Sequence, residues 1–136
     1  MDIYVYGFKA KYAYYRIDSK FNVIQKVIGY KEILDTDEKA EMYAIMRSIS
    51  ENFDKCKLMR FIHRGNRLRS LIKGKVRPKN SFEDVFISFV KSYKDSLIIH
   101  FSNAYNYEDK EEYVKVKNEI EKDVVKYIPI SRGDTL

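Results

Sequence analysis

The 136-residue chain is poor in several residue types that carry chemistry or staple small domains. It contains no tryptophan, one cysteine, two prolines and five scattered glycines. A lone Cys56 excludes a disulfide framework and a cysteine-rich metal site, and it has no surrounding signature of a reactive thiol. The sequence has no glycine-rich phosphate loop and no G-x-S-x-G motif. These absences leave a chain without the common signatures of nucleotide-binding, thiol or serine chemistry.

Long apolar runs are also missing. No stretch of about eighteen apolar residues occurs, so we expect no membrane span. The first residues alternate like a strand and lack the charged and apolar regions of a signal peptide. With a single cysteine, a reducing compartment fits, and we expect a cytoplasmic protein. The length predicts one domain with a true core over residues 1–128, followed by a flexible tail at 129–136.

Positive charge is concentrated in one part of the chain. The formal net charge is +6, and residues 55–79, "KCKLMRFIHRGNRLRSLIKGKVRPK", contain ten Lys/Arg and no acid. We call these residues the basic segment. The remaining residues hold 16 Lys/Arg against 20 Asp/Glu. A basic block on a mildly acidic body favours a polyanionic partner, although a solvated face would give the same composition.

The alternation of apolar residues predicts the elements. Strand patterns cover residues 3–8, 10–17, 21–31, 57–63 and 96–102. Helical spacing covers 35–53, a short helix opened by Gly65 and Asn66, 80–95 and 108–127. Asp35 and Glu38 resemble a capping box, and residues 103–107 read as a loop. Three meander strands followed by alternating helices and strands predict a mixed five-stranded α/β sheet, with two later strands parallel to the first and helices on both faces.

Within the basic segment, position in these elements selects seven candidate nucleic-acid ligands. Arg64 and Arg67 fall at a predicted strand-to-helix turn, where free backbone N–H groups also favour an anion. Arg69 and Lys73 fall on the outer face of the short helix. The last three lie in residues 74–80, which we call the basic loop: Lys75, Arg77 and Lys79. Together these side chains could follow several phosphates.

Aromatic and histidine residues offer weaker candidates. Stacking of bases on exposed tyrosines is conceivable for Tyr12, Tyr14, Tyr105 and Tyr107, but edge packing is the simpler interpretation for each. His63 and His100, the only histidines, each end a predicted apolar strand. With Glu41 they could form a metal or acid–base site, yet histidines hydrogen-bonded to a neighbour are the more common outcome.

The order of elements and several local stretches resemble the ribonuclease H family. "IYVYGF" resembles its first strand, "TDEKAEMYAIMRSI" its first long helix, and "FIHRGNRLRSLIKG" its fourth strand and following helix. "EDKEEYVKVKNEI" falls where the final helix carries the last aspartate. The resemblance covers nearly the whole chain in element order and little of it in residue identity. It implies a ribonuclease H-like fold.

The resemblance also implies where catalytic carboxylates would lie. Active members hold two Mg²⁺ ions with four carboxylates, one metal activating water and one steadying the leaving oxygen. The first position falls on Tyr6, the second on Glu41, the third on Arg64 and the fourth near Val114. Only Glu41 is an acid, so it is at most a catalytic remnant, and Arg64 would repel a metal. We therefore expect a degenerate member with no metal site.

Three functions from different classes remain open. The first is a non-catalytic domain that binds nucleic acid, whether RNA, DNA or a hybrid, through the basic segment. The second is an accessory or protein-interaction subunit of a viral or mobile-element complex, whose partner presents an acidic surface. The third is a nuclease with relocated carboxylates, drawn from Glu41 with Asp109, Glu111 or Glu112. Mg²⁺ would be a cofactor only in that third case.

Overall fold

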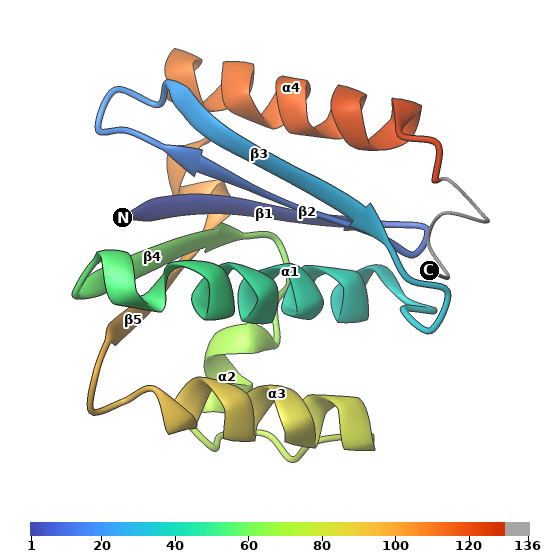
Figure 1. Cartoon of the computed structure of the whole chain (residues 1–136), viewed down its shortest axis with the longest axis vertical. Helices are drawn as coiled ribbons and strands as arrows, with labels where there is room; N and C mark the ends of the chain where they lie inside the picture. The colour runs from blue at the N-terminus through green and yellow to red at the C-terminus, as the bar shows by residue number, and fades with distance from the viewer. Residues whose placement is uncertain (130–136) are drawn as a thin grey trace.

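A five-stranded mixed sheet forms the centre of the computed structural model, which describes residues 1–129 (Figure 1). The strands lie in the order β3-β2-β1-β4-β5. The first three form an antiparallel meander, while β4 runs parallel to β1 and β5 parallel to β4. The predicted sheet is thereby confirmed. The strands are β1 (Asp2–Phe8), β2 (Lys11–Ile17), β3 (Val23–Tyr30), β4 (Leu58–His63) and β5 (Ile98–Asn103).

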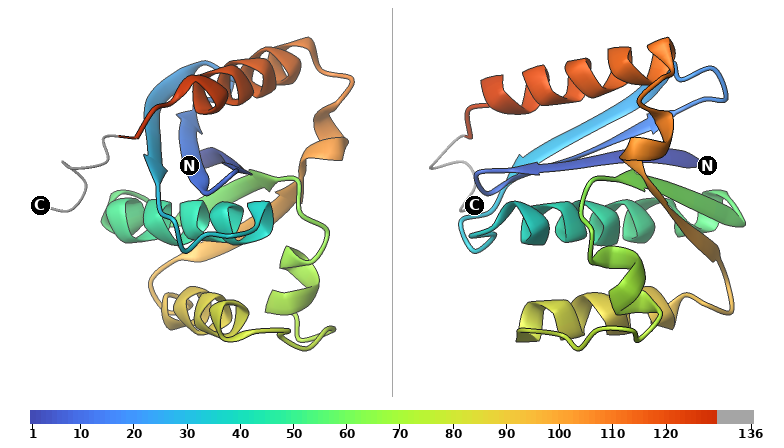
Figure 2. Two further views of the ribbon diagram at one scale, coloured as in Figure 1. Left: turned by 90° about the vertical axis from the view of Figure 1, so that its right-hand side faces the viewer. Right: turned by 180° about the vertical axis from the view of Figure 1, so that it is seen from behind.

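Helices cover both faces of the sheet, as the sequence predicts (Figure 2). On one face α1 packs against β1, β2 and β4, and α3 packs on α1 with α2 beside it. On the other face α4 packs across β1 and β2. The helices are α1 (Asp37–Asn52), α2 (Leu68–Ile72), α3 (Ser81–Ser92) and α4 (Glu111–Lys126), with short 3₁₀ turns η1 (Phe53–Lys55) and η2 (Ala104–Tyr107). No helix among residues 1–129 has the length and apolar character that crossing a membrane requires.

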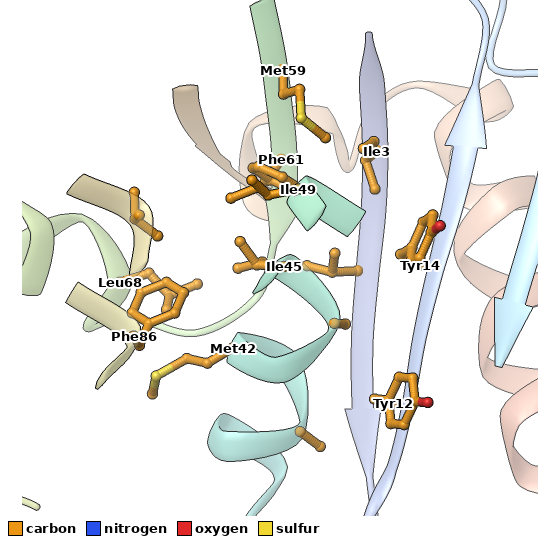
Figure 3. Packing of buried hydrophobic residues seen from close by; sticks show 14 of the residues in the cluster. Ile3, Tyr12, Tyr14, Met42, Ile45, Ile49, Met59, Phe61, Leu68 and Phe86 are labelled. Atoms are coloured by element: carbon orange, nitrogen blue, oxygen red, sulfur yellow. The ribbon is translucent and has the colours of Figure 1, made fainter. Parts of the chain in front are cut away.

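Two separate hydrophobic layers result from the alternation of side chains along the strands. The layer under α1 combines Ile3 and Tyr14 from the sheet with Ile45 and Ile49 from the helix (Figure 3). The layer under α4 is rich in tyrosine, and the hydroxyls of Tyr4 and Tyr113 lie 3.2 Å apart. The first strand therefore contributes to both layers, with Ile3 and Val5 under α1 and its aromatic residues on the α4 side.

Gly7 sets the distance between β1 and α1. A Cβ atom at this position would lie 2.4 Å from the carbonyl oxygen of Asp37 and 2.6 Å from the backbone nitrogen of Glu41. Both contacts are with backbone, which cannot move aside as a flexible side chain would. Glycine therefore lets the first turns of α1 cross directly over the end of β1, and this approach brings Glu41 to the sheet.

Several predicted boundaries are wrong by a few residues. The turn after β1 uses Lys9 and Ala10, both at positive φ, so β2 begins one residue later than expected. Thr36, not Asp35, caps α1 by accepting a hydrogen bond from the Lys39 N–H. Helix α2 begins at Leu68 rather than at Gly65 and Asn66. Residues 104–107 form a 3₁₀ turn instead of a loop, and the last helix begins at 111 rather than 108. From residue 130 on, the predicted tail lies outside the described residues.

Candidate functional site

The positions singled out on the first and fourth strands and on the first helix meet in one cleft. Because β1 and β4 are parallel neighbours, their carboxyl ends lie at the same edge of the sheet. The first turns of α1 reach that edge over Gly7. The cleft is lined by Tyr6, Gly7, Asp37, Glu38, Glu41, Arg64 and Gly65.

Glu41 lies at the base of this cleft with 5% of its surface exposed. Its Oε2 accepts the backbone N–H of Arg64 at 3.0 Å, and its Oε1 accepts that of Gly65 at 3.1 Å. Burial raises the pKa of the Glu41 carboxyl to about 7, against the opposing effect of these two N–H donors. Both oxygens are thus engaged in joining α1 to the residues that follow β4.

The other expected ligand positions hold groups that do not suit a metal. The guanidinium of Arg64 lies 3.5 Å from the carboxylate of Glu121 on α4, which Lys117 also contacts at 3.3 Å. Tyr6, from β1, is half-buried and supplies a phenol where a carboxylate would be required. The α4 acid that contacts a residue of the cleft is therefore Glu121, seven residues beyond the predicted position at Val114. Glu111 and Glu112 line a separate hollow together with Val114.

Two exposed acids missed by the sequence interpretation complete the cleft, and both have partners. Asp37 Oδ1 accepts the Lys9 N–H at 3.0 Å, and Glu38 pairs with Lys79 at 3.4 Å. Their positions three and four residues before Glu41 on one helix face were a usable signal. Within residues 1–129, no group of three His, Cys, Asp or Glu side chains could hold a metal ion. The residues of the cleft do not fit the two-Mg²⁺ centre that the fold family implies.

The two histidines do not join Glu41 in a site. His63 is buried at the end of β4 and meets the ring of Phe101 edge-on. Burial lowers the pKa of His63 to about 4, so the ring is neutral. Neither ring nitrogen has a hydrogen-bond partner in the described part of the chain, although a neighbour was expected. His100 is exposed in the middle of β5 rather than at a strand end.

Within the basic segment, Arg67 has a structural partner. Its guanidinium donates to both carboxylate oxygens of the buried Glu83, at 2.8 and 3.3 Å, and to the carbonyl oxygen of Arg77 at 3.2 Å. Glu83 also accepts the Lys79 N–H at 2.8 Å. Burial acts to raise the pKa of Glu83, but the hydrogen bonds from Arg67 and Lys79 outweigh it and hold this pKa below its usual value. We call this arrangement the Glu83 clamp, because it links α3 through Arg67 and Lys79 to the far end of the basic loop.

The remaining candidates differ in how free they are. Lys79 is exposed and pairs with Glu38, and Arg64 pairs loosely with Glu121. The other four are exposed and make no ion pair with any acid in residues 1–129: Arg69, Lys73, Lys75 and Arg77. They form a continuous run of unpaired positive charge from α2 into the basic loop. We call these four the free cations.

The tyrosines proposed for base stacking divide by burial. Tyr12 and Tyr14 are 6% and 0% exposed under α1, so they are core residues and cannot stack with a ligand (Figure 3). Tyr105 is 62% exposed, whereas Tyr107 packs against Phe21 and Tyr113. Edge packing or burial is therefore correct for three of the four.

Comparison with known proteins places this architecture in a class. RNase H1 from the halophilic archaeon Halobacterium salinarum NRC-1 is 8% identical, with a TM-score of 0.63 over 87% of this chain and 97% of that one. LC11-RNase H1, solved in complex with an RNA/DNA hybrid, is 13% identical, with a TM-score of 0.64 over 86% and 91%. Another structure of LC11-RNase H1, isolated from compost by a metagenomic approach, is 12% identical, with a TM-score of 0.60 over 92% and 95%.

These likenesses, together with the strand order, define an RNase H-like fold, which confirms the resemblance read from the sequence. No protein-family model and no curated protein sequence matches the chain. At identities of 8–13% the likeness shows the fold alone. Function must therefore be argued from the residues of the site.

Proposed function

We propose that this protein is a non-catalytic RNase H-like domain, a pseudoenzyme, that binds RNA, DNA or a hybrid through its basic segment. The observation that carries the proposal is the run of free cations from α2 into the basic loop, and it is supported by Tyr6 and Arg64 at positions where the family resemblance implies carboxylates. Cation-rich surfaces without internal partners attract polyanions, since a phosphate then replaces only water and counterions.

The free cations are arranged to follow a backbone rather than to hold one ion. Arg69 and Lys73 are four residues apart across α2, and Lys75 and Arg77 continue from the basic loop. Such contacts fix position on phosphates without reading sequence. We expect binding that depends strongly on salt and weakly on base sequence.

In the cleft, Arg64 supplies a further positive group toward the same ligand. Its contact with Glu121 is long, at 3.5 Å, and 39% of its side chain is exposed. A phosphate can therefore compete with Glu121 for the guanidinium. Tyr6 and Arg64 in place of carboxylates support binding without strand cleavage.

The test is anisotropy binding of a fluorescent RNA/DNA hybrid, with single-stranded RNA and duplex DNA for comparison, over a salt series. We choose Lys75→Glu with Arg77→Glu, because neither side chain has an acidic partner in residues 1–129. The double variant should lose at least about tenfold in affinity, and the slope of log K against log salt should fall by about 2.

A matched control carries the same change in net charge elsewhere. Lys20→Glu with Lys94→Glu alters two exposed lysines outside the basic segment. This control should change the affinity far less than the loop variant. Equal losses in the two double variants, or wild-type affinity in the loop variant, would reject the basic segment as the binding surface.

A further inference from the structure

The outer side of β5 is an open strand edge. β5 ends the strand order, and no other strand within residues 1–129 pairs with that side. Ile98 donates its N–H to the carbonyl oxygen of Lys57 at 2.9 Å, toward β4. Because backbone groups alternate along a strand, the N–H and C=O groups of Ile99 and Phe101 point away from β4. An edge of this kind is a template for another extended chain.

A cationic pocket surrounds this edge. Ile99 and Phe101 line it from β5, Arg69 and Lys73 from α2, and Arg60 from β4. His100, Ser102, Asn106 and Ile72 complete the lining, and the pocket contains no acidic residue. The pocket, of about 440 Å³, is therefore both apolar at its strand edge and positively charged on its walls.

The three formal cations of the pocket have no acidic partners in the described chain. Arg60, Arg69 and Lys73 make no ion pair with an acid among residues 1–129. Charges at a sheet edge normally discourage pairing with like strands, and these three flank the β5 edge from β4 and α2. The same charges favour one kind of strand, namely one that carries carboxylates.

We infer that the β5 edge docks an extended acidic peptide from a partner protein, which adds a sixth strand and sets its carboxylates against Arg69 and Lys73, while Arg60 lies on the opposite face of the sheet. Main-chain groups of the peptide would pair with Ile99 and Phe101 at the two-residue repeat of a strand. A nucleic acid supplies phosphates but no alternating N–H and C=O groups, so the open edge favours a peptide. The apolar lining suits uncharged residues between the acids.

This site goes beyond the proposed nucleic-acid function and overlaps it at two residues. Arg69 and Lys73 belong to both surfaces, so substituting them cannot distinguish peptide binding from nucleic-acid binding. Lys75 and Arg77 belong to the nucleic-acid surface alone, while Ile99 belongs to the peptide site alone. Variants at these unshared positions make the two ideas fail independently.

The experiment uses a labelled, acetylated eight-residue peptide in which valine alternates with glutamate, measured by anisotropy. Its control is the same sequence N-methylated at every second residue, which removes the N–H donors along one side of the strand and keeps all charges. Two such peptides are possible, one methylated at the odd and one at the even positions. We expect the peptide whose methyl groups replace the N–H donors facing β5 to bind about tenfold or more weakly, since strand addition relies on main-chain hydrogen bonds. A peptide with lysine in place of glutamate should not bind.

On the protein side, Ile99→Pro removes an outward N–H without removing a bond to β4. We expect it to weaken peptide binding by about tenfold while leaving hybrid binding within about twofold.

If this variant misfolds, the N-methylated peptides still test the idea against the unchanged protein. Parent and N-methylated peptides of equal affinity in both registers would overturn strand addition. Peptide binding lost in Lys75→Glu with Arg77→Glu but retained in Ile99→Pro would overturn it as well. Failure of the unchanged protein to bind the hybrid, with peptide binding intact, would count only against the proposed function.

Discussion

Glu41 accepts a hydrogen bond from the backbone N–H of Arg64 at 3.0 Å, so the buried acid of the cleft is tied to the first residue after β4. The second oxygen accepts the N–H of Gly65, whose own Cβ position lies 2.8 Å from that oxygen. A residue larger than glycine would therefore collide with the carboxylate. The two hydrogen bonds fasten α1 to the residues that follow β4.

The pH dependence of stability should separate Glu41 from His63. Glu41 has a pKa of about 7 in the fold against an ordinary 4.5, so its contribution to stability is full below about 4.5 and is lost as pH rises toward 7. His63 has a pKa of about 4 against 6.5, so its contribution is lost as pH falls through the same range. The two opposing effects should leave wild-type stability nearly flat between about pH 4.5 and 6.5.

Single substitutions expose each dependence. In Glu41→Gln the free energy of unfolding should rise with pH across this range, because only His63 still titrates. In His63→Leu it should fall, by a total on the order of 3 kcal/mol. Urea denaturation at several pH values measures both. Parallel curves for the wild type and Glu41→Gln would contradict the assignment, as would a Glu41 carboxyl titrating at 4.5 or below by NMR.

Cleavage assays address the expected loss of two-metal catalysis. The wild type should leave an RNA/DNA hybrid intact in Mg²⁺, because Tyr6 and Arg64 stand where carboxylates would bind the ions. Tyr6→Asp with Arg64→Asp adds two acids beside Glu41 and should introduce divalent-cation binding, detected by calorimetry. Mg²⁺-dependent cleavage by the wild type that disappears in Glu41→Ala would instead establish a nuclease with rearranged ligands.

Gly7→Ala should destabilise the fold strongly. The added methyl would lie within 2.8 Å of three α1 atoms, two of them backbone, so the helix must move away from β1. We expect a loss of about 1–3 kcal/mol or more in the free energy of unfolding by urea. Gly74→Asn is the matched control, because Gly74 has φ +73° but no atom within 4 Å of its Cβ position, and asparagine tolerates this conformation. Equal effects in the two variants would contradict a special role for the close contact at Gly7.

Glu83→Ala should loosen the basic loop. It removes the acceptor of Arg67 and of the Lys79 N–H, at an expected cost of about 2–3 kcal/mol. Faster amide hydrogen exchange in residues 74–80 should accompany this loss. Asp84→Ala, at the exposed neighbouring position, should change stability by less than about 0.5 kcal/mol. Unchanged amide hydrogen exchange in the Glu83 variant would show that the Glu83 clamp does not restrain the basic loop.

The fold was predictable because its periodicities are strong. Ile45 and Ile49 on α1, and Val116 and Ile120 on α4, are all buried as their spacing indicates. The start of α2 was not predictable from local pattern. Residues 64 and 65 remain outside the helix and donate their N–H groups to Glu41, which lies 23 and 24 residues earlier, and such a tertiary contact leaves no local signal.

The site was predictable in part, and the misses have physical causes. Helix α4 packs across β1 and β2 with Tyr113 at Tyr4 and Glu121 near Arg64, so the α4 acid that pairs with Arg64 comes from the middle of the helix. The order of residues in the sequence does not show how α4 is positioned against the sheet. Likewise, Arg67 reads as one more cation of the basic segment until its partner Glu83, 16 residues later, is brought beside it.

The Glu83 clamp also bears on the entropy of association. Arg67 holds the carbonyl of Arg77 while Glu83 holds the N–H of Lys79, so the chain that presents Lys75 and Arg77 is already fixed near its far end. A loop that is already held in place loses less conformational entropy on binding a ligand than a mobile loop does. Affinity at this surface should then depend on the rigidity of the loop as well as on its charge. Removing the contacts of the Glu83 clamp should weaken binding even when every lysine and arginine of the loop is retained.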